Sequence, residues 1–126
     1  MKTLNIIETA YRATLEEQDD PVVWIVHAMK GAGADHSVVL RANAVNYTVK
    51  AQGTTPLAFG ARRQKNGLRL ADSVSGLIGK GVDVYVVSDD LDERGLQGEE
   101  LISGLNLVRK IDLPALVGQF DRVWHW

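Results

Sequence analysis

The stretch GVDVYVVSDDLDERGL, residues Gly81–Leu96, decides the fold class of this chain. It begins with an almost continuously apolar run, Val82–Val87, changes to polar residues at Ser88–Asp90 and closes on Gly95. A short run of β-branched and aromatic residues is typical of a strand buried in a parallel sheet. We therefore predict a central parallel strand that runs into a polar turn. Ligands bind outside the carboxyl ends of such strands, so this turn is the first candidate for a site.

Strand and helix patterns alternate on both sides of this central strand. The further predicted strands are Thr3–Thr9, Ser37–Arg41, Leu105–Lys110 and Arg122–Trp126, and the predicted helices are Pro21–Lys30, Ala44–Ala51, Leu70–Ile78, Gly98–Gly104 and Leu113–Phe120. A helix over Leu4–Glu17 fits the first stretch almost as well as a strand does. The alternation predicts one three-layer α/β/α domain over residues 1–126, with about five mainly parallel strands.

Local signals place several boundaries of these elements. Asp20 followed by Pro21 has the form of a helix start, with Asp20 as the N-cap. Asn43 is a candidate cap for the helix that follows the second strand. From Gln52 to Gly67 the periodicity fails, which predicts a long surface loop, and loops of this length are often functional.

Composition excludes several classes of function. The net charge of −2 supplies no broad basic face for nucleic acid and no polybasic patch for a membrane. No apolar run is long enough to span a bilayer, and the start lacks a signal-peptide core, so we expect a cytoplasmic protein. There is no cysteine, and the three histidines lack metal-ligand spacing, so we expect neither a metal site nor a cofactor.

Four stretches of the chain together resemble the DsrE/DsrF-like family of small α/β proteins. They are ETAYRATLEEQDD, VVLRANAVNYTVKAQ, LIGKGVDVYVVSDDLDERGL and DLPALVGQFDRVWHW, and the similarity extends over nearly the whole chain. The resemblance implies a five-stranded, mainly parallel sheet, assembly into trimers or hexamers, and a sulfur relay that carries a persulfide on one cysteine. Counted back from Arg94 and Gly95, the position of that cysteine falls on Val87.

Valine at position 87 changes what the resemblance implies about activity. A persulfide needs a thiolate sulfur, and this chain contains none, so persulfide transfer by its own cysteine is excluded. We expect a non-catalytic, homo-oligomeric binding or assembly subunit related to sulfur transfer, which docks on a sulfur-transfer protein. The alternative is a small-ligand-binding protein or small enzyme that uses a polar crevice at the strand ends.

The candidate site residues gather at predicted strand ends and in the long loop. The crevice candidates are Asn43, Asn46, Val87, Ser88, Asp89, Asp90 and Arg94, and the loop candidates for binding an anion or a partner are Arg62, Arg63, Lys65 and Arg69. Each has a structural alternative. Ser88 or Asp89 can cap the next helix, Arg94 can pair with Asp90 one helical turn earlier, and loop charges are commonly just solvated.

Two histidines receive structural interpretations. His27 lies on a mainly apolar helix, which favours a partly buried structural role. His125 lies between Trp124 and Trp126, and strand alternation sends both tryptophans to the same face. We expect at least one of them to pack within the molecule, and we place a subunit contact near this terminal edge as a hypothesis.

Overall fold

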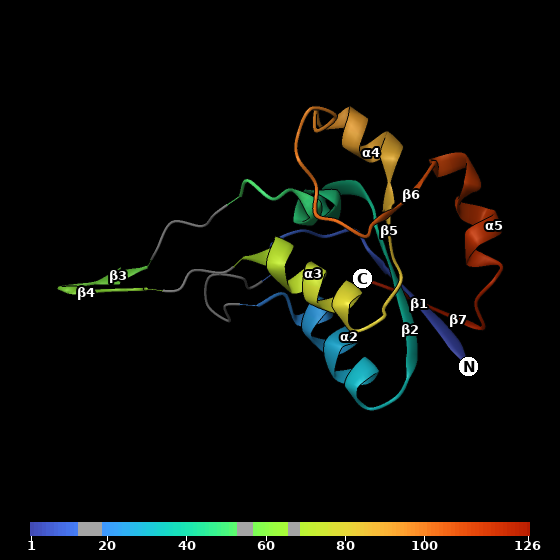
Figure 1. Ribbon diagram of the computed structural model, residues 1–126, viewed down its shortest axis with the longest axis horizontal. Coiled ribbons are helices and arrows are strands. Elements are labelled where there is room, and N and C mark those ends of the chain that lie inside the picture. Colours follow the sequence, from blue (N-terminus) through green and yellow to red (C-terminus); the bar gives the residue numbers. More distant parts are fainter. Residues whose placement is uncertain (13–18, 53–56, 66–68) are drawn as a thin grey trace.

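A five-stranded sheet forms the centre of the computed structural model, which describes residues 1–12, 19–52, 57–65 and 69–126. The strand order is β6-β5-β2-β1-β7, and every neighbouring pair is parallel (Figure 1). The strands are β1 Lys2–Ile7, β2 Asp35–Leu40, β5 Val84–Val87, β6 Asn106–Val108 and β7 Arg122–His125. The predicted fold class is confirmed, and the first stretch is a strand rather than the alternative helix.

Helices cover both faces of the sheet (Figure 1). One face carries α2, Pro21–Gly31, and α3, Leu70–Gly79, whereas the other carries α5, Leu113–Val117. The short helix α4, Ser88–Glu93, lies at the carboxyl ends of the strands, as does the 3-10 helix η1, Ala42–Thr48. A second 3-10 turn, η2 at Lys110–Asp112, leads into α5. In the described part of the chain, no helix is both long and apolar enough to cross a membrane.

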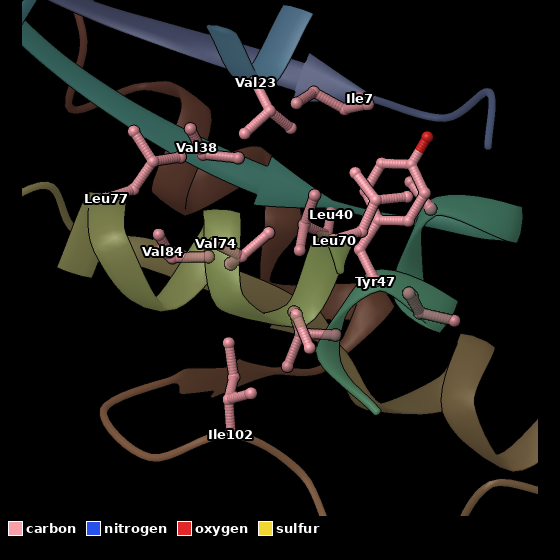
Figure 2. Packing of buried hydrophobic residues seen from close by; sticks show 14 of the residues in the cluster. Ile7, Val23, Val38, Leu40, Tyr47, Leu70, Val74, Leu77, Val84 and Ile102 are labelled. Atoms are coloured by element: carbon pink, nitrogen blue, oxygen red, sulfur yellow. The ribbon is translucent and has the colours of Figure 1, made fainter. Parts of the chain in front are cut away.

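The two faces of the sheet bury two separate apolar clusters because successive side chains of a strand point to opposite sides. Val38 joins the larger cluster with α2 and α3, which Figure 2 shows. Its neighbour Val39 joins a smaller cluster beside α5 with Leu4, Val87 and Leu116. Full burial of one such side chain contributes about 1.5–3 kcal/mol, so both clusters hold the helices on the sheet.

The start of α2 confirms the predicted cap. The Asp20 carboxylate is completely buried and accepts hydrogen bonds from the backbone N–H groups of Val22 at 2.8 Å and Val23 at 3.2 Å. Pro21 occupies the first turn, where its missing N–H leaves no donor unpaired. The polar stretch before this cap includes residues 13–18, which lie outside the described residues.

Two predicted helices are corrected. No helix forms over Gly98–Gly104, because this segment instead pairs in extended form with the end of η1, where Val49 and Leu101 make an antiparallel bridge. The second predicted helix begins at Ala42 rather than Ala44 and has no capping side chain, so the cap prediction for Asn43 is wrong. In both cases contacts to distant segments outweigh the local pattern.

The predicted loop contains a small hairpin. Its strands are β3, Ala58–Phe59, and β4, Arg62–Arg63, and they form a two-stranded sheet of their own. Residues 53–56 and 66–68 of the predicted loop lie outside the described residues. Figure 1 shows the hairpin standing away from the central sheet and its helices.

Candidate functional site

The carboxyl ends of β2, β5 and β6 meet around one buried carboxylate. Asp90 is 3% exposed, and its Oδ2 atom accepts the backbone N–H of Ala42 at 2.8 Å. Its Oδ1 atom lies 3.6 Å from Nζ of Lys110, which follows β6. Ala42 has a φ of +50°, a left-handed conformation that residues other than glycine rarely adopt. A buried charge and a strained backbone thus coincide at this edge of the sheet, and such features concentrate at functional sites.

Asp89 and Ser88 connect α4 to the segment after β6. The Asp89 carboxylate accepts the backbone N–H of Lys110 at 3.0 Å, and this hydrogen bond lowers the pKa of Asp89. The Ser88 hydroxyl lies within 3.5 Å of both Asp89 Oδ1 and the Val108 carbonyl. Neither residue caps α4, since the helix begins at Ser88 itself with Val87 in the cap position. The capping interpretation is therefore wrong.

Arg94 binds to Asn43 across the same edge. Its Nε and Nη2 atoms donate to Asn43 Oδ1 at 3.1 and 3.0 Å, and its Nη1 atom donates to the backbone carbonyl of Asp90 at 3.3 Å. The predicted contact with Asp90 is thus made to the carbonyl, and the nearby carboxylate is that of Glu93 at 3.8 Å. Asn46 donates to the Asn43 carbonyl at 2.8 Å. The polar crevice candidates mainly hydrogen-bond to one another and tie α4 to η1 and β6.

Val87 differs from the other crevice candidates because it is apolar and completely buried. It belongs to the cluster on the α5 face with Leu4, Val39 and Leu116. Val87 therefore separates the polar network at the strand ends from the apolar layer under α5.

An open pocket of about 330 Å³ lies between the sheet and α5. Its lining residues are Ile6, Val39, Arg41, Lys110, Leu113, Pro114 and Val117. Five of these are apolar, and the two cationic side chains come from the carboxyl ends of β2 and β6. Ligand pockets commonly combine a mainly apolar lining with a few placed polar groups, and their volumes start at about 300 Å³. This pocket is the candidate functional site.

Both cationic side chains of the pocket form ion pairs with carboxylates. Arg41 Nε lies 3.2 Å from Glu8 Oε1, and the same oxygen lies 3.1 Å from His125 Nε2. Lys110 Nζ is 3.8 Å from Glu93 in addition to its contact with Asp90. The Arg41–Glu8 and Lys110–Glu93 pairs are partly exposed on both sides, so each contributes only about 0–1 kcal/mol and a ligand can replace one of them.

Sequence reasoning missed Arg41 and Lys110 as site residues. Both end predicted strands, Ser37–Arg41 and Leu105–Lys110, so they occupy the position that made Ser88–Asp90 candidates. The rule that sites lie at strand carboxyl ends therefore contained the signal for both. The sequence alone did not show which strand ends lie next to one another around α5.

The basic loop candidates lie apart from this pocket. Arg62, Arg63 and Lys65 are exposed on the hairpin, and Arg69 pairs with Asp72 at 3.0 Å at the start of α3. None of the four lines the pocket.

The structural roles predicted for His27 and for the two tryptophans are confirmed, and the subunit contact near them stays a prediction. His27 Nε2 contacts the Ser73 carbonyl at 2.9 Å, which joins α2 to α3 in a structural role. Trp124 packs edge-on against His36 with ring centroids 5.1 Å apart, and Trp126 Nε1 donates to Asn5 Oδ1 at 3.3 Å. The two tryptophans also contact each other, so they share one face as predicted.

Residues 1–12, 19–52, 57–65 and 69–126 contain no group of three or more histidine, aspartate or glutamate side chains arranged to hold a metal ion. Instead, the Asp89 and Asp90 carboxylates accept backbone N–H groups, and Asp90 also contacts Lys110 Nζ.

Comparisons with known proteins bear on the fold. No protein-family model and no curated protein matches the sequence. Among solved structures, the ychN protein from E. coli superimposes with a TM-score of 0.70 at 16% identity, covering 100% of both chains. BT1422 from Bacteroides thetaiotaomicron, a conserved protein of unknown function, gives 0.65 at 12% identity, covering 99% of this chain and 95% of its own.

MTH1491 from Methanobacterium thermoautotrophicum, also of unknown function, gives a TM-score of 0.61 at 14% identity, covering 98% of this chain and 96% of its own. Identities this low establish the fold and nothing about activity. They are consistent with the DsrE/DsrF-like resemblance of the sequence. The chain thus has the α/β fold of the ychN protein, BT1422 and MTH1491 over essentially its whole length.

Proposed function

We propose that this protein is a non-catalytic, homo-oligomeric binding or assembly subunit of the DsrE-like kind, related to intracellular sulfur transfer. The observation that supports this function is the position and the burial of Val87. It occupies the position that the resemblance assigns to the sulfur-carrying cysteine, and it is completely buried among Leu4, Val39 and Leu116. A sulfur relay needs an accessible thiolate, so this position serves packing instead.

Exposed apolar side chains support self-association. On the β6 edge of the sheet, Leu107 is 65% exposed and Ile111, in η2, is 78% exposed. Val123, on the opposite edge strand β7, is 41% exposed. Large apolar side chains near one another commonly mark interfaces. We expect a trimer or hexamer, and a sulfur-transfer protein as its docking partner.

Light scattering after size-exclusion chromatography tests the proposed assembly, together with native mass spectrometry of protein purified gently from its own cells. We expect a trimer or hexamer, with or without the mass of a partner chain. The variant Ile111→Glu should weaken the assembly, whereas Gln119→Glu, an exposed polar position after α5, should leave it unchanged. A monomer at every concentration tested would remove the proposal.

A second candidate function is small-ligand binding in the pocket beside α5. The supporting observation is the mainly apolar lining with Arg41 and Lys110 at the strand ends. This arrangement favours a mainly apolar ligand with one anionic group, because Arg41 can exchange Glu8 for a ligand anion.

Native mass spectra also test ligand binding. A small-molecule adduct on the wild-type protein that disappears in Val117→Trp, which fills the pocket, supports this function. The control Ser75→Trp adds an indole ring at an exposed position on α3, outside the pocket lining, and should retain the adduct. An adduct that survives Val117→Trp would rule out the pocket as its site.

A further inference from the structure

Residues 57–65, which we name the arm, form the hairpin that stands away from the sheet in Figure 1. Gly60, with a φ of +60°, makes the turn between β3 and β4. Within the arm, Gln64 N–H donates to the Leu57 carbonyl at 2.8 Å, and the Leu57 N–H donates to Gln64 Oε1 at 3.2 Å. These contacts close the hairpin on itself rather than onto the central sheet.

The arm exposes an aromatic side chain and three cations. Phe59 is 75% exposed, and Arg62, Arg63 and Lys65 are exposed around it. Among the described residues, none of these three cations forms an ion pair. An isolated two-stranded hairpin is at best marginally stable in water, and aromatic and arginine side chains are enriched at interfaces. The arm therefore has the composition and the exposure of a docking element.

Charge is divided unevenly along this chain. The arm carries three basic residues and no acidic one, whereas residues 88–100, which we name the acidic segment, carry six carboxylates and one arginine. The rest of the chain has ten basic and ten acidic residues, which cancel. Asp92 and Glu99 of the acidic segment are exposed and form no ion pair in the described part of the chain. The surface that complements the arm is thus present on the protein itself.

We propose that the arm docks on the acidic segment of a second copy of this chain. Nucleic acids and anionic membranes also attract cations, but Asp92, Glu99 and the other exposed carboxylates of the acidic segment repel both. A contact between two different surfaces of identical subunits is heterologous, and rotation closes such contacts into rings. The inference rests on the proposed homo-oligomer and names the contact that builds it.

Sedimentation velocity of paired charge-reversal variants tests the contact. Arg62→Glu with Arg63→Glu should weaken self-association at least about tenfold, because it places like charges opposite each other. Asp92→Lys with Glu99→Lys should weaken it similarly. An equimolar mixture of the two variants should recover association, since each supplies the charge that the other lacks. Phe59→Ser should weaken association without changing its salt dependence.

A matched control separates this effect from net charge. Lys30→Glu with Lys80→Glu makes the same change in charge at the ends of α2 and α3, which precede the amino ends of β2 and β5, and should not alter association. If the arm variant assembles like the wild type, the arm contact is wrong and the proposed function stands. If the wild type is monomeric, both fall.

Binding of a duplex DNA oligonucleotide or of phosphatidylserine vesicles, measured at low salt, completes the test. Neither should bind the wild-type protein. Binding that disappears in the Arg62→Glu, Arg63→Glu variant while assembly persists would assign the arm to a polyanion and overturn the contact between copies.

Discussion

The backbone N–H of Ala42 donates a 2.8 Å hydrogen bond to the buried carboxylate of Asp90. The two residues are 48 positions apart, so this bond joins the start of η1 to α4. Ala42 has a φ of +50°, a conformation that costs an L-residue about 1–2 kcal/mol. Asp90 thus helps hold a strained backbone at the strand ends beside the candidate pocket.

Removal of this carboxylate should destabilise the protein. Asp90→Ala leaves the Ala42 N–H without its partner, and an unsatisfied buried donor costs about 1–3 kcal/mol. Urea unfolding followed by circular dichroism measures the change. The control Asp92→Ala, in the same helix but exposed, should shift the free energy of unfolding by less than about 0.5 kcal/mol. Equal effects of the two variants would contradict the assigned role of Asp90.

Tyr47 should make stability fall at alkaline pH. Its completely buried hydroxyl donates to Asp20 Oδ2 and accepts the Tyr11 N–H. Burial raises the pKa of Tyr47 above its ordinary value of 10.0, and the hydrogen bond to Asp20 adds to the increase. Because the folded pKa is raised, this contribution is complete below pH 10 and is lost as pH rises toward the folded value.

The variant Tyr47→Phe tests this linkage. At neutral pH it should lower the free energy of unfolding by about 1–3 kcal/mol, because the buried Asp20 carboxylate and the Tyr11 N–H each lose a hydrogen bond. Above pH 10 the difference from wild type should shrink, since the variant has no phenol to ionise at this position. Parallel pH dependence of the two proteins in urea unfolding would contradict the prediction.

His36 should make stability fall at mildly acidic pH. Its Nδ1 atom lies 2.9 Å from Nδ2 of Asn5, whose Oδ1 atom accepts from Trp126. Nδ1 accepts this hydrogen bond only while the ring is neutral. Burial lowers the pKa of His36 below 6.5, against the opposing charge of Asp35. The contribution is therefore complete above pH 6.5 and is lost as pH falls through the folded pKa.

Comparison with the variant His36→Gln separates the effect of His36 on stability from the effect of carboxylates that titrate in the same pH range. Between neutral pH and about pH 5, below the ordinary histidine pKa, the wild type should lose more stability than the variant does. Thermal unfolding followed by tryptophan fluorescence at several pH values measures the difference. Identical pH dependence would show that His36 does not contribute.

A cysteine introduced at position 87 should be inert in the folded protein. Val87→Cys places a thiol where the side chain is completely buried and apolar, and such surroundings raise a thiol pKa. The native chain has no cysteine, so thiol labelling reports only the introduced residue. Labelling should be at least about a thousandfold slower than for Ser75→Cys, an exposed position on α3, because it requires unfolding.

The stability of Val87→Cys provides the internal check. A substitution of similar volume should cost less than about 1.5 kcal/mol, so the variant should remain folded. Its labelling rate then reports the accessibility of position 87 in the folded protein. Rapid labelling of a folded variant would show that the position is accessible and would reopen a sulfur-carrying role for relatives with cysteine there.

Local signals predicted those parts of the fold in which all interacting atoms lie close in sequence. The cap at Asp20 is one example, because its partners Val22 and Val23 follow within three residues. The apolar run at Val84–Val87 is another, since burial on both faces requires such composition. The predicted cap at Asn43 failed because its oxygen binds Arg94, 51 residues away.

The sequence by itself determined the five strands of the central sheet and the helices that begin at Pro21, Leu70 and Leu113, because hydrophobic periodicity is a local property, and it excluded thiol chemistry, because the chain contains no cysteine. Only the tertiary structure decided that Arg41 and Lys110 line one pocket and that Asp90 turns inward while Asp89 holds the chain after β6. Strand order and the packing of α5 bring these groups together, and both depend on contacts between segments far apart in the chain.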